Sequence, residues 1–293
     1  MKKSISTVIA VIIILVLILS FSACSVEEYH PKEESLPVGT VFHAQNAEGI
    51  DITYKVTGDW ECQVGDGIYT AINNETEGRV VIPRQVRDGY QVKRINDHAF
   101  TYCANLTEIV IPEVNEIGYG AFMDCKKLCS IEIPATTKYI GIDAFYNCSA
   151  LLSLNLPANT ETLESFSFAS CGLTSISIPK GVKTIESGCF YCCSDLTSVE
   201  LNEGLKSIGR AAFYLCPIET LTIPSSVIFI NKYAFIYSNL KTLRIQSDKP
   251  FDIHANAFTS DNYDNVTLIV PKGSRMAYSY AEYWSNFKTI IEE

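Results

Sequence analysis

Cysteine is the residue type whose number and spacing could support chemistry in this chain. The 293 residues include 11 cysteines but only four histidines. Thiolates in such numbers could form disulfide bonds or ligate zinc. Six of the cysteines recur at intervals of 22 or 23 residues: Cys103, Cys125, Cys148, Cys171, Cys193 and Cys216. Their role therefore depends on the elements that set this interval.

A phenylalanine precedes each of these cysteines by three residues, and the phenylalanine series extends beyond them at the same interval. Ile or Leu lies five residues before each phenylalanine, and a small residue lies directly before it. After the cysteine, most repeats continue with apolar-x-x-Ile-x-Ile-Pro, as in Leu128–Pro134. A fixed period of roughly 20–50 residues is the signature of stacked structural repeats. The repeat phenylalanines are Phe100, Phe122, Phe145, Phe168, Phe190, Phe213, Phe235 and Phe258.

Each part of the repeat predicts a local structure. The Ile-x-Ile alternation predicts a short strand with one buried face. Proline ends the strand because it lacks the backbone N–H that a ladder needs. The Ala-Phe-x-x-Cys stretch does not alternate, and we expect a turn or short helical segment there, on the opposite side. A single coil cannot bury its apolar row alone, so stacked neighbours must bury it together.

The stacking also predicts the state of the cysteines. Equivalent positions on successive coils point the same way, at the spacing of neighbouring strands, which exceeds the Cβ separation of about 3.8 Å that a disulfide prefers. We therefore expect a reduced, buried row of sulfur atoms. The regular spacing follows from the repeat itself, so it does not indicate zinc, and we predict neither a metal nor a cofactor.

The histidines do not suggest catalysis. His30, His43, His98 and His254 lie in different parts of the repeat or before it, and no serine–histidine–acid arrangement can be assembled from them. The sequence also lacks a P-loop and a dinucleotide-binding fingerprint. We expect a protein that is not an enzyme.

The segment Ile117–Pro134 matches the unit Ile-Gly-x-x-Ala-Phe-x-x-Cys-x-x-Leu-x-x-Ile-x-Ile-Pro at every fixed position. This unit is that of the BspA-like class of bacterial leucine-rich repeats, which the chain resembles from about Val80 to its C-terminus. Asn202 and Gln246 depart from the pattern by replacing the proline. The resemblance implies a leucine-rich-repeat solenoid of stacked short parallel strands with turn or short-helix segments on the opposite face. It also implies a surface protein that adheres to protein of a host or neighbouring cell.

The N-terminus resembles a lipoprotein leader. Lys2 and Lys3 precede an apolar run, and Ser20–Cys24 resembles a lipobox, from which Phe21 departs. We predict a signal peptide over residues 1–23, lipid on Cys24 and a tether over 24–45, which gives an exported lipoprotein of the cell surface or outer envelope. Simple cleavage or a retained membrane anchor are the alternatives. The lipid would be the only membrane contact.

The folded part divides into three predicted segments. A β-rich N-terminal cap spans residues 46–94, about eight coils span 95–265, and a C-terminal cap spans 266–293. Ser274 is the expected N-cap of a helix over Met276–Trp284. Trp284 suits a packed cap residue better than a carbohydrate platform.

Charge limits the choice of partner. The formal net charge of the chain is −10, and no basic cluster interrupts it. An acidic surface repels phosphate backbones, so nucleic acid is not an expected partner.

Two surfaces are candidate binding sites. The first is the outward row of the predicted strands; serine and threonine also suit solvated strands that bind nothing. Its residues are Ser130, Glu132, Ser153, Asn155, Ser175, Ser177, Ser198, Glu200, Thr220 and Thr222. The second is an aromatic ridge one or two residues after the repeat phenylalanines, which could equally fold over neighbouring coils. Its residues are Tyr102, Tyr146, Tyr191, Tyr214 and Tyr237.

The leading functional hypothesis is non-catalytic adhesion to an extracellular protein. A glycan-binding accessory lipoprotein and a structural envelope protein without a specific ligand are the alternatives. Exposed aromatic rings distinguish the first two, because glycan capture needs them and protein adhesion does not.

Overall fold

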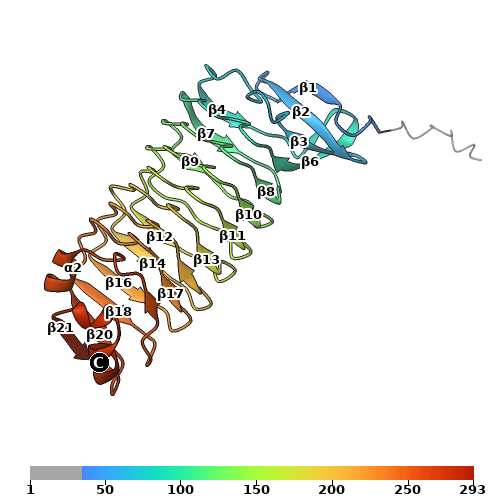
Figure 1. Cartoon of the computed structure of the whole chain (residues 1–293). Helices are drawn as coiled ribbons and strands as arrows, with labels where there is room; N and C mark the ends of the chain where they lie inside the picture. Colours follow the sequence, from blue (N-terminus) through green and yellow to red (C-terminus); the bar gives the residue numbers. More distant parts are fainter. Residues whose placement is uncertain (1–34) are drawn as a thin grey trace, which may run out of the picture. The chain divides into compact units, whose positions relative to one another are not determined.

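The Ile-x-Ile segments form a row of short parallel strands, as predicted. The computed structural model describes residues 35–293, and Figure 1 shows the strands side by side on successive coils. Equivalent residues pair from one coil to the next, as Ile109 does with Ile131. The strands of this Ile-x-Ile row are β4 (Gly78–Val81), β7 (Leu106–Val110), β9 (Ser130–Ile131), β12 (Ser175–Ser177), β14 (Ser198–Glu200), β16 (Thr220–Ile223), β18 (Thr242–Ile245), β20 (Thr267–Val270) and β21 (Thr289–Glu292). The fold is a solenoid of stacked parallel strands with few helices.

A second row of parallel strands lies before the repeat phenylalanines and was not predicted. Most of its members have two residues, too few to show alternation. Ile117, Ile140 and Leu163 pair in register along it. The strands of this second row are β8 (Glu116–Ile117), β10 (Tyr139–Ile140), β11 (Thr162–Leu163), β13 (Thr184–Ile185), β15 (Ser207–Ile208), β17 (Phe229–Ile230) and β19 (Asp252–Ile253).

The Ala-Phe-x-x-Cys stretch is a turn and not a helix. In each of the first seven coils, two residues have a left-handed backbone conformation. They stand two positions before and two positions after the phenylalanine; in the coil of Phe145 they are Asp143 (φ 53°) and Asn147 (φ 60°). A left-handed residue breaks a helix, so the helical alternative fails here. The turns bond to one another across coils instead, as where the Phe122 N–H donates to the Ala144 carbonyl at 2.7 Å.

The phenylalanine side chains stack face to face through the centre of the coils. Neighbouring ring centroids lie 5.1 to 5.6 Å apart, with interplanar angles of 3° to 13°. All eight rings are buried. Offset stacking of buried aromatic rings adds to the stability that area burial provides.

The predicted sulfur row is buried and free of disulfides. Beyond filling space, each thiol from Cys125 to Cys216 donates to the carbonyl of the repeat phenylalanine one coil earlier, at 3.0 to 3.2 Å. Burial raises the pKa of Cys103 to about 12 and that of Cys125 well above its ordinary value. Cys103 and Cys125 therefore stay protonated, which keeps the Cys125 thiol available as a donor.

The N-terminal cap is a set of strands that continues the second row. β1 (Val41–Gln45) and β2 (Asp51–Gly58) are antiparallel, β2 pairs with β3 (Glu61–Val64), and β3 runs parallel to β6 (Tyr90–Ile95). β5 (Gln85–Val86) and the 3-10 turn η1 (Arg87–Gly89) precede β6. β1 lies within residues 24–45, so folded structure begins inside the range predicted as tether.

The C-terminal cap differs from its prediction in detail. The expected helix over Met276–Trp284 is divided into α3 (Arg275–Tyr280) and the 3-10 turn η2 (Trp284–Asn286), because Tyr283 is left-handed (φ 61°). Ser274 makes no side-chain cap to α3; its hydroxyl donates to the Pro271 carbonyl instead. A further helix, α2 (Ser260–Asn265), precedes β20.

Trp284 packs in the cap, as its sequence context predicted. Its ring is 1% exposed, and its Nε1–H donates to the Phe251 carbonyl at 2.7 Å. A buried indole whose donor is satisfied is a packing element and not a ligand platform.

Replacing Phe168 with alanine should lower the free energy of unfolding by about 3–5 kcal/mol, because it leaves a cavity between two stacked rings. Chemical denaturation monitored by circular dichroism measures this change. Phe166→Ala is the matched control: that ring lies on the surface two residues away and should cost about 1 kcal/mol or less. Equal losses for the two variants would contradict the stacked core.

The thiols should divide sharply in reactivity. Cys129 is exposed and Cys192 is half-buried, whereas the other eight cysteines of residues 35–293 are buried. Maleimide labelling of the native protein, mapped by mass spectrometry, should modify Cys129 first and Cys192 more slowly, because burial raises the pKa of the latter. The remaining eight should react only in denaturant. Rapid native labelling of the row from Cys103 to Cys216 would refute the buried arrangement.

Candidate binding surfaces

All ten predicted strand-face residues lie along the Ile-x-Ile row. Nine are exposed and Thr222 is half-buried. Where strands pair, the row is in register: Ser175 aligns with Ser198, and Ser177 aligns with Glu200. Ser153 and Asn155, however, lie in a stretch that forms no strand.

The strand ladder is interrupted at Ser153–Leu156. Strands β9 and β12 on either side belong to separate sheets, and the backbone N–H groups of this stretch make no hydrogen bond to other backbone atoms of the described chain. Leu156 replaces the second isoleucine of the repeat, and leucine suits a pleated strand less well. Leu154 does not explain the interruption, because Leu221 and Leu243 occupy its position in paired strands. A second division of this row falls between β14 and β16.

Three adjoining hollows flank this interruption and together form what we call the strand-face groove. One of about 500 Å³ lies between residues 129–135 and 153–157. A second of about 460 Å³ shares Ser130 and Glu132 with it, and a third of about 520 Å³ shares Leu154 and Asn155. The groove is therefore lined by hydroxyl, amide and carboxylate groups. Glu132 has no ion-pair partner within residues 35–293.

The predicted aromatic ridge is not one surface. Tyr102 and Tyr237 lie two residues after their phenylalanines and are 57% and 61% exposed, whereas Tyr146, Tyr191 and Tyr214 lie one residue after and are half-buried. Only the last coils bring these side chains together. Tyr191 stacks on Tyr214 (centroids 4.9 Å apart, 8° between planes), and Tyr214 meets Tyr237 edge to face at 5.4 Å.

Two further aromatic residues, missed from the sequence, join this cluster. Phe166, 38% exposed, meets the Tyr191 ring edge to face at 6.1 Å. Its ring lies against Gly188, where a Cβ atom would come within 2.2 Å of it. Tyr233 occupies the equivalent position three coils later. Both stand two residues before a repeat phenylalanine. Aligning the coils at that position would have shown these two aromatic residues in the sequence.

An acidic cluster lies on the second strand row beside a hollow of about 550 Å³. The row is divided between β11 and β13, where Glu164 and Glu186 replace the glycine of the repeat. The pKa of Glu186 is raised, chiefly by burial and secondly by the nearby Glu164 carboxylate. The same two causes, in the same order, raise the pKa of Tyr139. Within residues 35–293 no group of His, Cys, Asp and Glu side chains is arranged to hold a metal ion.

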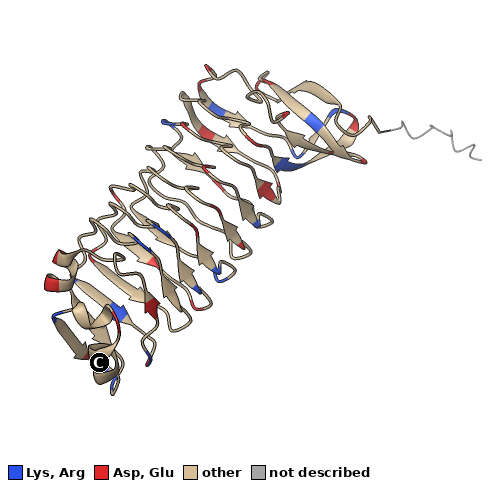
Figure 2. Ribbon diagram, in the orientation of Figure 1, with Lys and Arg blue, Asp and Glu red and all other residues tan. Residues whose placement is uncertain are grey.

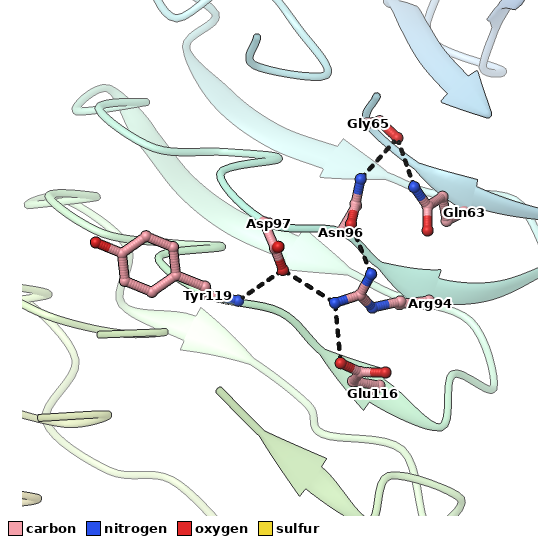
Figure 3. Close-up of polar contacts among 7 residues, drawn as sticks. All are labelled: Gln63, Gly65, Arg94, Asn96, Asp97, Glu116 and Tyr119. Atoms are coloured by element: carbon pink, nitrogen blue, oxygen red, sulfur yellow. Dashed lines mark hydrogen bonds and ion pairs between the residues drawn. The ribbon is translucent and has the colours of Figure 1, made fainter. Parts of the chain in front are cut away.

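Arg94 forms a polar network that joins the N-terminal cap to the first coils (Figure 3). Its guanidinium donates to Asn96 Oδ1 at 2.7 Å and pairs with Asp97 and Glu116, each at 2.9 Å. Asn96 in turn donates to the Gly65 carbonyl in the cap. Since these acceptors come from the chain itself, the network serves to fix the cap on the repeats.

The described histidines are not placed for catalysis. Thr53 Oγ1 and the Asp51 carboxylate both lie near Nδ1 of His43, at 3.3 and 3.6 Å, on an exposed hairpin. A catalytic histidine instead uses one nitrogen for the nucleophile and the other for the acid. His98 bonds to Thr101 Oγ1, and His254 accepts from the Asn256 N–H.

Charged residues are dispersed along the coils (Figure 2). The predicted signal peptide and Cys24 lie outside the described residues. In the part of the chain that the structure covers, no helix combines the length and apolar character needed to cross a membrane.

Comparison with solved structures gives similar solenoids. A leucine rich cell surface protein from Faecalibacterium prausnitzii is 19% identical, with 88% of this chain and 96% of that chain covered and a TM-score of 0.51. A leucine-rich repeat protein from Bacteroides ovatus is 21% identical, with 89% and 76% covered and a TM-score of 0.46. A search of curated proteins found no match.

The repeat itself identifies the family. Residues 85–195 and 161–283 match the model described as the BspA type leucine rich repeat region, in six copies. These two overlapping ranges span most of the chain, and the protein belongs to the BspA-type leucine-rich-repeat family.

Proposed function

We propose that this protein is a non-catalytic recognition protein of the cell surface that binds a host or neighbouring-cell protein through the strand-face groove. The observation that carries the proposal is the groove beside the interrupted ladder at Ser153–Leu156, which exposed polar side chains line. An extended peptide segment can lie along this groove and exchange hydrogen bonds with those side chains, which would select its sequence.

The lipoprotein-like leader supports a location at the surface. A solved structure similar to this chain is that of a leucine rich cell surface protein, which agrees with this location. A non-catalytic role is supported by the geometry at His43, which meets both Thr53 and Asp51 through the single nitrogen Nδ1, whereas a catalytic histidine uses one ring nitrogen for each partner. Glycan capture has less support because Tyr191 and Tyr214 each cover one face of the other ring, and a sugar needs a free face.

The groove can be tested with an array of extracellular-matrix proteins and glycans probed with the purified protein. A protein ligand found this way should bind Ser130→Arg, Asn155→Arg at least about tenfold more weakly, because both arginines fill the groove. Ser194→Arg, Asn239→Arg is the matched control, with the same substitutions at exposed positions outside the groove. Cys129, which lines the groove, should also be alkylated more slowly in the complex.

Three results would count against this proposal. Equal binding by both double variants would place the site elsewhere. Binding only to glycans would favour the accessory role in polysaccharide capture. Binding to nothing on the array would leave a structural envelope protein.

The lipid anchor is a separate proposal, tested by expressing the full chain in a bacterium that processes lipoproteins. Cys24→Ser should abolish incorporation of radiolabelled palmitate and move the protein from the membrane fraction to the soluble fraction, since no other attachment is proposed. Cys129→Ser is the control and should change neither readout. Membrane retention of the Cys24→Ser protein would indicate that the leader itself stays as the anchor.

A further inference from the structure

A second surface of distinct chemistry lies over the fourth to seventh coils, those of Phe168 to Phe235, on the turn side of the solenoid. It consists of exposed or half-buried apolar and aromatic side chains that follow one another coil by coil, and it shares no residue with the strand-face groove. We call it the aromatic patch. Its members are Phe166, Tyr191, Tyr214, Leu215, Tyr233 and Tyr237.

Two cations border the aromatic patch. The Arg210 guanidinium lies 5.7 Å from the Tyr233 ring centroid and the Lys232 ammonium lies 4.5 Å from it. Neither pairs with a carboxylate in the described chain, whereas Lys138, Lys241 and Lys288 do. In a chain of net charge −10, this edge of the patch is therefore locally positive.

Several ring faces in the patch are already covered. Tyr191 and Tyr214 cover one another, and the cations lie over Tyr233. A sugar binds tyrosine by lying flat on a free ring face, so the patch is poorly suited to glycans. What it does present is ring edges, phenol hydroxyls, the 43% exposed Leu215 and two unpaired cations. Tyrosine and arginine around an apolar centre are typical of protein interfaces.

We propose that the aromatic patch binds an acidic segment of a partner protein, independently of the strand-face groove. Carboxylates of that segment pair with Arg210 and Lys232, and its apolar side chains pack on Leu215 and the tyrosine edges. Charge complementarity at the rim sets the rate and selectivity of binding, while the apolar contacts hold the complex.

A fluorescent peptide of alternating Glu and Leu is the probe, with its Lys-Leu counterpart and a hyaluronan oligosaccharide for comparison. Anisotropy measurements should show binding of the Glu-Leu peptide alone, weakened by salt. Arg210→Glu, Lys232→Glu should weaken it at least about tenfold. Lys249→Glu, Lys272→Glu, an equal change of charge at two exposed lysines outside the patch, should not. Melting curves verify that both double variants are folded.

The exposed thiol of Cys129 and the half-buried thiol of Cys192 report which surface the peptide covers. Cys192 lies beside Tyr191 in the coil that supplies the patch, and Cys129 lines the strand-face groove. The proposal expects the Glu-Leu peptide to slow alkylation of Cys192 and leave Cys129 unchanged. It is overturned if only Cys129 is protected, if hyaluronan or the Lys-Leu peptide binds as tightly, or if the Arg210→Glu, Lys232→Glu protein binds like wild type. Because Cys129 reports the groove separately, failure here is distinguishable from failure of the proposed function.

Discussion

The contact on which the rest of the structure depends is the stacking of each repeat phenylalanine on the next. With centroids 5.1 to 5.6 Å apart along the whole series, every coil must return its chain to the same place after 22 or 23 residues. The thiol of the following coil then bonds to the phenylalanine carbonyl, which fixes the backbone beside the ring. Buried positions thus have little freedom to vary, since a change of side-chain volume in a close-packed core disturbs the packing of the neighbouring residues. The inward rows therefore accept only a few small or apolar residue types, whereas the outward rows vary freely.

The same stack explains how the solenoid tolerates an interruption in both strand rows near the middle. Pairing fails on both sides of Ser153–Leu156 and again between β11 and β13. Across this region the rings of Phe145, Phe168 and Phe190 remain stacked at 5.3 and 5.6 Å. Because the core continues, main-chain groups can lose their strand pairing without dividing the unit.

How much the sequence could predict depends on whether a feature repeats. The Ile-x-Ile row, the buried phenylalanines and the reduced cysteines repeat in almost every coil, and all three are confirmed. The second strand row was missed because two residues cannot show a period. The turn at Ala-Phe-x-x-Cys depends on residues with a left-handed backbone. Only some coils have glycine at such a position, as at Gly120 and Gly188, whereas Cys192 adopts the same conformation although its residue type does not predict it. The divided C-terminal helix has the same cause at Tyr283.

The candidate surfaces were predictable in part for a related reason. Alternation placed the strand-face residues correctly, because it fixes which side chains point outward. It could not place the groove, which lies where one coil departs from the repeat and forms no strand. The tyrosines show the opposite error: Tyr102 and Tyr214 differ by one position relative to the phenylalanine, and in a turn one position is enough to change direction. Since outward side chains such as Arg210 and Ser130 contact little of the core, substitutions can alter either surface with little effect on the stack, and binding specificity can change independently of stability.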